Sequence, residues 1–228
     1  MKIILAILFL FLSLNLFSQN KPNFEANDSL YREDQFYVSI SYNKLINKPI
    51  GFAQNRFAPS FSFGFLRDMP INKSRTFAIA TGLGYSINNY NQNLLVTENN
   101  QMLNYITFSS NVAYDKNKLI LDYVDLPIEV RWRTSTPESH KFLRIYTGFK
   151  LSCLVFDRSK YVDEQGTNRI IGNSDFSKFQ YGTYLSVGYN TWNGYVYYGL
   201  NPIFKSGTLD NKNIEIRTLN FGLIFYIL

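Results

Sequence analysis

Two alternating segments between Leu119 and Phe156 constrain the fold of this chain more than any other feature. Apolar residues occupy every second position, while charged, small or polar residues fill the positions between them. The apolar rows are Val124, Leu126, Ile128, Val130 and Trp132 in the first segment and Leu143, Ile145, Phe149, Leu151, Cys153 and Val155 in the second. A period of two is the side-chain period of a β-strand. A charged face opposite a continuous apolar face must point to water or to a sealed polar interior, and the second arrangement is that of a transmembrane β-barrel.

The N-terminal residues 1–18, MKIILAILFLFLSLNLFS, predict a secretory signal peptide, because one lysine precedes an apolar run from Ile3 to Leu12. A membrane anchor helix is the alternative, but the run is shorter than the roughly 20 residues that a spanning helix needs. We expect cleavage after Ser18, a periplasmic lead-in over residues 19–35, and a barrel over residues 36–228. The remainder has no other apolar run of spanning length, so any crossing must use strands.

The same alternation recurs along the chain and predicts eight strands. Their expected ranges are 36–43, 57–67, 75–88, 119–133, 141–156, 179–191, 195–204 and 214–228. The connections alternate between long loops (44–56, 89–118, 157–178 and 205–213) and short turns (68–74, 134–140 and 192–194). Short turns on one side, long loops on the other and 17% aromatic residues are typical of outer-membrane barrels. The sequence therefore predicts an all-β, eight-stranded antiparallel up-and-down transmembrane barrel in the outer membrane, with short turns and both termini in the periplasm.

The inward-facing charges predict a polar network in the lumen. An eight-stranded barrel is just wide enough for side chains to fill, and buried charges are costly unless they are paired. The two opening segments are expected to pair antiparallel through the turn at 134–140, with the numbers of paired residues summing to about 273 to 275. This register places Asp125 near Gly148 or Lys150, and Glu129 near Arg144 or Tyr146. The predicted network consists of Asp125, Glu129, Arg131, Arg144 and Lys150. We interpret it as structural; the alternative is a transport or catalytic role.

Two tryptophans are predicted to mark the membrane boundary. Trp132 and Trp192 fall near the periplasmic ends of their expected strands, where an indole ring can sit between acyl chains and head groups. The alternative is that either ring packs within a turn. We expect a membrane-interface girdle.

The residues needed for catalysis or metal binding are scarce. His140 is the single histidine and lies in an expected turn, where a solvated side chain is a better interpretation than a catalytic base. One histidine and one cysteine cannot supply a metal ligand set. The glycines of Gly82-Leu-Gly84 lie inside a strand, where they indicate close packing and no phosphate loop. We expect no enzyme activity, no cofactor, no metal, no nucleic-acid partner and no small-molecule substrate.

Several motifs together resemble one family. They are the Asp68-Met69-Pro70 turn, FAIATGLGY (77–85), YVDLPIEV (123–130) and the GLIFY ending (222–226). The mature chain as a whole is similar to the PorT-type outer-membrane β-barrel proteins of Bacteroidota. The resemblance implies an accessory role in type IX protein secretion, gliding motility or outer-membrane protein assembly, and it supplies no catalytic residues.

The loop 89–118 is more apolar than a solvated loop requires. Its possible partner-contact residues are Leu94, Leu95, Met102, Leu103 and Tyr105. A partner would explain them, and so would a loop that folds over the barrel mouth. Two functions stay open: a subunit of a multi-protein outer-membrane machine, or a free-standing barrel with a structural or ligand-binding role through its extracellular loops. The expected partners are outer-membrane lipid, lipopolysaccharide and other outer-membrane proteins in a larger complex.

Overall fold

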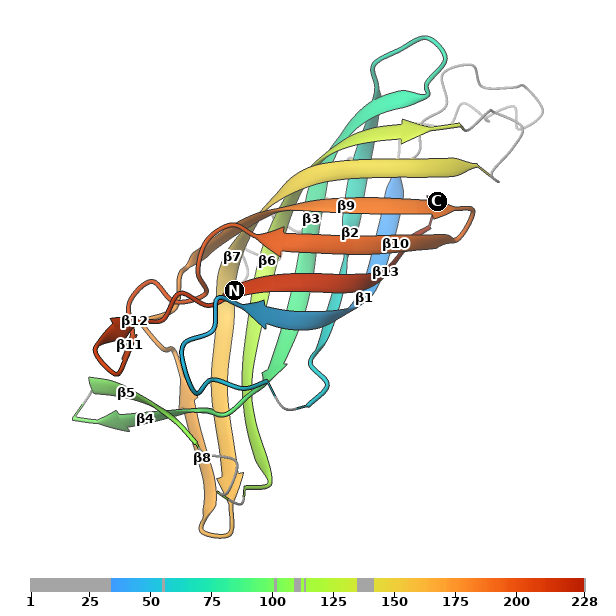
Figure 1. Ribbon diagram of the computed structural model, residues 1–228. Helices are drawn as coiled ribbons and strands as arrows, with labels where there is room; N and C mark the ends of the chain where they lie inside the picture. Colours follow the sequence, from blue (N-terminus) through green and yellow to red (C-terminus); the bar gives the residue numbers. More distant parts are fainter. Residues whose placement is uncertain are drawn as a thin grey trace, which may run out of the picture. The chain divides into compact units, whose positions relative to one another are not determined.

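A closed antiparallel β-barrel forms the body of the protein (Figure 1). The structure is a computed structural model, and it describes residues 34–227 apart from positions 55, 101, 109–111, 113 and 135–141. The barrel strands are β1 (Gln35–Ile46), β2 (Pro59–Pro70), β3 (Phe77–Asn91), β6 (Lys116–Arg133), β7 (Leu143–Asp163), β9 (Phe179–Tyr189), β10 (Trp192–Gly199) and β13 (Arg217–Ile227). Each pairs with the next in the chain, and β1 closes the ring by pairing with β13. This confirms the predicted eight-stranded up-and-down barrel. The predicted signal peptide and most of the predicted lead-in lie outside the described residues.

The burial pattern is the reverse of that of a soluble protein. In β1, Phe36 is 60% exposed whereas the next residue, Tyr37, is 6% exposed. In β2, Phe61 and Phe63 point outward while Ser62 between them is buried. An apolar outer wall around a polar interior is stable when the wall faces acyl chains. The predicted outward and inward rows are therefore confirmed. None of the described residues forms a helix long and apolar enough to span a membrane.

The register of β6 against β7 differs from the prediction. Asp125 lies opposite Ser152, and Glu129 lies opposite Gly148, so the expected pairing of Glu129 with Arg144 or Tyr146 was wrong. The cause is that the connection between β6 and β7 is longer than predicted, because β7 begins at Leu143 and not at 141. The Leu143 carbonyl accepts a hydrogen bond from the Thr134 amide. A displacement by two residues keeps each side chain on its face, so the same residues still point inward.

Two predicted turns were also placed wrongly. Asp68 and its neighbours to Pro70 are the last residues of β2, and the connection follows them. The predicted turn at 192–194 lies inside β10, because Trp192 already pairs with Tyr189. Asn190 instead takes the left-handed φ of 56° that a two-residue hairpin turn needs at its first position.

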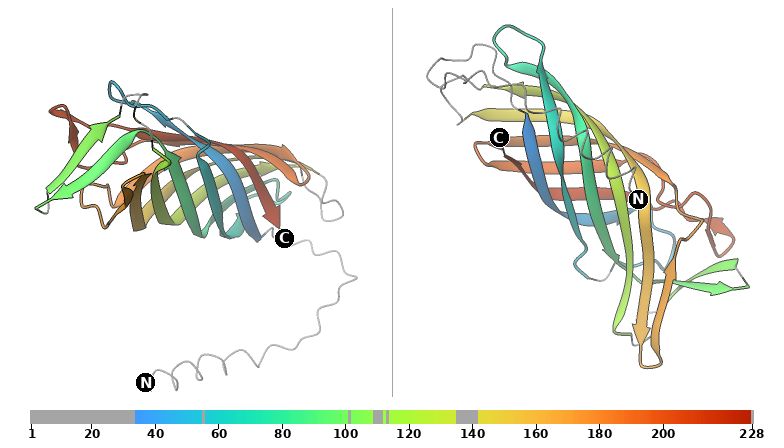
Figure 2. Two further views of the ribbon diagram at one scale, coloured as in Figure 1. Left: turned by 90° about the horizontal axis from the view of Figure 1, so that it is seen from below. Right: turned by 180° about the vertical axis from the view of Figure 1, so that it is seen from behind.

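The long connections gather at one end of the barrel and carry further strands (Figure 2). We call this the long-loop end and the other the short-loop end. The extra strands are β4 (Leu94–Asn99), β5 (Met102–Thr107), β8 (Gly166–Ile171), β11 (Thr208–Leu209) and β12 (Lys212–Asn213). The β4–β5 hairpin lies within the expected loop 89–118. β6 and β7 continue past the barrel, where β7 also pairs with β8.

The long connections share an apolar core. We call the connections 47–58, 92–115, 164–178 and 200–216, together with the strand ends that they pack against, the cap. Its buried core consists of Leu45, Phe52, Tyr90, Leu94, Val96, Tyr105, Leu119, Leu121, Tyr123, Ile170, Phe176, Ile203, Phe204, Leu209, Ile214 and Ile216. Loops that bury this much apolar surface together form a folded unit.

Candidate functional site

A buried ion-pair cluster fills the short-loop half of the lumen. The Arg131 guanidinium lies 2.7 Å from a Glu129 carboxylate oxygen and 3.0 Å from Asp68 Oδ1. Arg133 donates to both Asp68 oxygens at 2.9 Å, which is the bidentate geometry of a strong arginine–carboxylate pair. The side chains of Asp68, Arg131 and Arg133 are fully buried. With Glu129, the cluster has four side chains, two positive and two negative, so its net charge is zero.

Strand alternation explains how this cluster forms. Residues 129, 131 and 133 share the inward face of β6, and Asp68 reaches them from the inward face of β2, across β3. Ala78 and Ala80 on the inward face of β3 are small enough to let side chains meet over them. The small residues of β3 therefore make room for the large charged groups of its neighbours.

A second pair lies further toward the long-loop end. Lys150 Nζ is 3.4 Å from Asp125 Oδ2, and Ser152 donates to the other Asp125 oxygen at 2.5 Å. The lysine nitrogen also lies 4.6 Å from the centre of the Tyr197 ring, a cation–π distance. Lys150 is thus held by one charge and one aromatic face.

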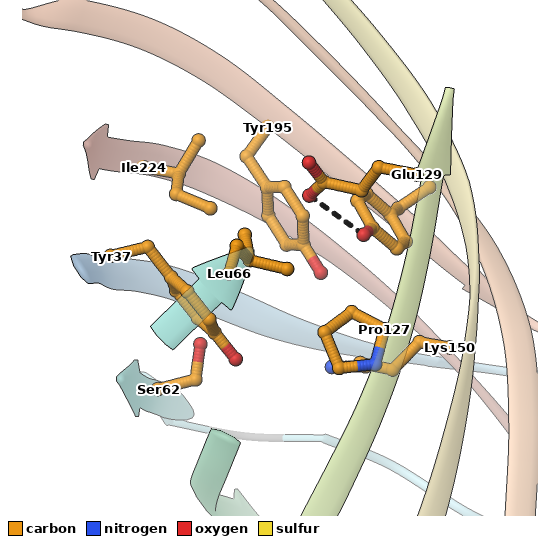
Figure 3. Close-up of a pocket in the computed structure, with 9 residues that line it drawn as sticks. Tyr37, Ser62, Leu66, Pro127, Glu129, Lys150, Tyr195 and Ile224 are labelled. Carbon is orange, nitrogen blue, oxygen red and sulfur yellow. Dashed lines mark hydrogen bonds between the residues drawn. The ribbon is translucent and has the colours of Figure 1, made fainter. Parts of the chain in front are cut away.

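Tyrosines complete the filling of the lumen (Figure 3). Tyr184 donates to Glu129 Oε1 at 2.8 Å, and Tyr37 and Tyr195 line the same cavity. This cavity and a second one, bounded in part by Tyr197, have volumes of about 20 Å³ each. A volume of that size holds about one water molecule. Within the described residues, these two lumen cavities have room for a water molecule each and none for a sugar.

The structure brings together four of the five predicted lumen residues as two pairs. Glu129 contacts Arg131, and Asp125 contacts Lys150. Arg144 is buried but joins neither pair: its guanidinium lies over the Phe142 ring at 4.4 Å, and its Nε and Nη1 have no hydrogen-bond partner among the described residues. The structural role of the network stays a prediction.

Asp68 and Arg133 belong to the cluster but were not among the predicted network residues. Asp68 was assigned to a turn because Met-Pro follows it. The sequence held a usable signal, since extending the inward row of Ser60, Ser62 and Leu66 by two residues reaches Asp68.

The β4–β5 hairpin anchors the cap. The Tyr105 hydroxyl donates to Asp175 Oδ2 at 2.8 Å, and its ring meets Phe204 edge-on at 5.5 Å. Burial raises the pKa of the Tyr105 phenol, so the hydroxyl stays protonated and remains a donor. The contact ties β5 to two connections that are remote in sequence.

The five predicted partner-contact residues separate into buried and exposed ones. Leu94 and Tyr105 belong to the cap core, and Leu103 packs against it. Leu95 is half-buried, whereas Met102 is 69% exposed. Partner contact stays a prediction, and Met102 is the residue best placed for it.

The two predicted girdle tryptophans lie at the short-loop end. Trp132 is the penultimate residue of β6 and is half-buried. Trp192, the first residue of β10, is 65% exposed and meets Phe225 edge-on at 5.5 Å. Their position at a membrane interface stays a prediction.

The described residues hold no group of three His, Cys, Asp or Glu side chains that could bind a metal ion. Cys153 is half-buried on the outward face of β7. His140 lies outside the described residues.

Comparisons with known proteins point to the barrel. Residues 17–205 match a family described as outer membrane protein beta-barrel domain. Two solved structures of Ail, the attachment invasion locus protein of Yersinia pestis, are similar in fold. One, in complex with the heparin analogue sucrose octasulfate, is 12% identical with a TM-score of 0.34, and the other is 10% identical with a TM-score of 0.32. Both alignments cover 86% of this chain and 100% of Ail. No curated protein sequence matches the chain.

The family match bears out the barrel part of the resemblance drawn from the sequence motifs. The PorT-type assignment, the bacterial phylum and the role in type IX secretion or gliding stay predictions.

Proposed function

The chain belongs to the family of outer membrane protein beta-barrel domains, and from that premise we propose that it is a non-enzymatic, non-conducting barrel that displays a folded binding cap at the cell surface. The family places it in the outer membrane.

The cap core is the observation that carries the proposal. Sixteen buried side chains from the four long connections and the adjoining strand ends pack into one cluster. A pore needs loops that leave its mouth open, whereas here the loops pack on one another next to a lumen already filled by ion pairs and tyrosines. The filled lumen supports a closed barrel, and the folded cap supports a function in recognition.

The proposed orientation puts the short-loop end in the periplasm and the cap outside. Outer-membrane barrels have short periplasmic turns and longer extracellular loops, and this chain has the same division. The two tryptophans at the short-loop end suit the periplasmic boundary of the outer membrane.

Cysteine labelling tests the display of the cap. In a Cys153→Ser background, a Met102→Cys variant places a thiol on the exposed face of β5, and a Lys73→Cys variant places one in the short connection between β2 and β3. A membrane-impermeant maleimide added to intact cells is expected to label the first thiol, and to label the second only after the outer membrane is permeabilised. Labelling in the opposite order would contradict the proposed orientation.

A second candidate function is a subunit of a multi-protein outer-membrane machine, such as the type IX secretion, gliding or assembly machinery that the motif resemblance implies. Exposed apolar side chains on the cap favour it: Met102 and Ile106 share one face of β5, and Ile50 is 89% exposed. Apolar groups presented to water outside the bilayer often mark protein contacts.

Purification in mild detergent separates the two candidates. A machine subunit would migrate with large partners, and Met102→Glu would release them. Gln165→Glu is the matched control, because Gln165 is exposed in the turn between β7 and β8, outside β5, and the change adds the same charge. A species of a single chain's mass in the wild type would contradict the subunit role and leave the free-standing barrel.

A further inference from the structure

The protruding ends of β6 and β7 form, with β8, a three-stranded ribbon whose outer face is strongly basic. Five cationic side chains share this face: Lys116, Lys118, Arg158, Lys160 and Arg169. The opposite face of the ribbon turns Leu119, Leu121 and Ile170 into the cap core. One face is therefore committed to folding. On the other, Lys116 and Arg169 are exposed, and Lys118, Arg158 and Lys160 are half-buried.

The strand register sets three of these cations side by side. Lys118 pairs with Lys160, and Lys160 pairs in turn with Arg169, so one row of three positive charges crosses the ribbon. Arg158 adjoins this row on the barrel side and Lys116 on the far side. Like charges directly opposite each other on a sheet face are about 5 Å apart at Cβ and destabilise the pairing.

Nothing among the described residues neutralises the row. No carboxylate in the described part of the chain lies within the 4 Å of an ion pair from any of the five cations. Asp122, on the barrel side, accepts a hydrogen bond from Tyr85, and of the five cations its charge acts on Arg158, which lies outside the row of three. At the ribbon tip, Asp163 accepts hydrogen bonds from the backbone of its own turn. The basic face keeps a repulsion that an anionic ligand would remove.

The basic face continues the lipid-facing wall of the barrel. Val124 is the last residue of the exposed apolar row of β6, and Lys118 follows it six residues further from the barrel. At about 3.3 Å per residue and a strand tilt near 40°, the row of three lies about 15 Å beyond Val124, with Arg158 between them. Ile171, next to Arg158 on the same face, is also exposed. Cations that begin where the apolar wall ends match a membrane head group better than a soluble polymer.

We propose that the row Lys118–Lys160–Arg169, with Arg158 and Lys116, binds the phosphate groups of the lipopolysaccharide head group. Ammonium and guanidinium groups form charge-assisted hydrogen bonds with phosphate oxygens. The acyl chains of the same lipid would cover the apolar wall below. The inference rests on the proposed orientation, in which the ribbon stands in the outer leaflet.

The test is the affinity of the full chain, in zwitterionic detergent, for lipid A that carries both phosphates. The variant replaces the whole row: Lys118→Gln, Lys160→Gln and Arg169→Gln. The matched control changes the net charge by the same amount on other connections: Lys178→Gln, Lys205→Gln and Lys212→Gln. A basic residue near an anionic membrane contributes about fivefold, so the row variant is expected to bind about 100-fold more weakly, and the control within about twofold of wild type. Dephosphorylated lipid A is expected to bind weakly to all three proteins.

Several results would overturn the inference: unchanged affinity in the row variant, an equal loss in the control, or equal binding of dephosphorylated lipid A. Tighter binding of inorganic polyphosphate than of lipid A would also overturn it, by assigning the face to a soluble polyanion. Without lipid, the row variant is expected to be at least as heat-stable as wild type, because a like-charge contact is removed; a lower midpoint would contradict the repulsion argument. Surface labelling is a separate assay, so failure of lipid binding and failure of the proposed display can be told apart.

Discussion

Replacing Asp68 by Asn tests whether the lumen cluster is a major source of stability. Asp68 is the shared partner of Arg131 and Arg133 and is fully buried. Asn keeps the shape and one acceptor, but it removes the negative charge and turns an amide N–H₂ toward a guanidinium donor. Arg131 then keeps the Glu129 carboxylate, whereas the carboxylate that Arg133 contacts is gone.

The magnitude follows from the geometry. With charge centres about 4 Å apart and an effective dielectric constant near 20, each Asp68 ion pair is worth about 4 kcal/mol before desolvation. Because the desolvation of the arginines persists when their partner is removed, breaking one buried pair costs about 3 to 5 kcal/mol. We expect Asp68→Asn to lower the free energy of unfolding by that amount.

Urea unfolding of the full chain in phospholipid vesicles, followed by tryptophan fluorescence, measures this change. Asp210→Asn is the matched control, because Asp210 is an exposed turn residue with φ of 51°, which Asn also tolerates. It is expected to change stability by less than about 0.5 kcal/mol. The double variant Asp68→Asn with Arg133→Gln restores charge balance, so its loss is expected to be smaller than the sum of the single losses by about 1 to 3 kcal/mol. A loss below about 1 kcal/mol for Asp68→Asn, or simple additivity, would refute the reasoning.

Three further predictions concern packing, membrane position and the cap. Gly82→Ala is expected to disrupt β2–β3 pairing and abolish heat-modified gel migration, because its Cβ would lie 1.8 Å from the Phe65 carbonyl oxygen; Gly194→Ala, whose Cβ would meet Val187 O at 3.6 Å, is expected to fold normally. Lipid quenchers near the head groups are expected to quench tryptophan fluorescence more than quenchers at the bilayer centre, and the reverse order would contradict a girdle role for Trp132 and Trp192. Tyr105→Ala is expected to make the β4–β5 hairpin protease-sensitive in the folded barrel, because it removes a core ring and the Asp175 contact; unchanged protease resistance would show that the cap does not depend on Tyr105.

The alternation of side chains made the barrel predictable. A lipid-facing wall and a filled lumen impose a period of two on every strand, so Phe61, Phe63 and Ser62 could be assigned to their faces without tertiary information. The same period predicted which charged side chains face the lumen, because the face of a side chain is unchanged when the register shifts by two residues.

Pairing and turn chemistry were harder to predict. The partner of Glu129 depends on the length of the connection between β6 and β7, which no local pattern reveals. The predicted turn at 192–194 contains Asn193-Gly194, a pair typical of hairpin turns. The sheet overrides this local preference and keeps both residues in β10, so the turn falls at Asn190 instead. The cap was beyond sequence reasoning because its core joins residues as distant as Leu45 and Ile216. The apolar residues of loop 89–118 signalled burial or contact, and only the fold separates Leu94 from Met102.

Electrical recording across a planar lipid bilayer tests the closed lumen most directly. With the lumen filled by the Asp68 and Lys150 ion pairs and by tyrosines, the purified wild-type chain is expected to insert without producing conductance steps, under conditions in which a known porin conducts. Insertion is verified by protease protection of the same reconstituted protein. Stable, stepwise ion conductance by the wild-type chain would contradict the closed barrel and return the search for function to the lumen.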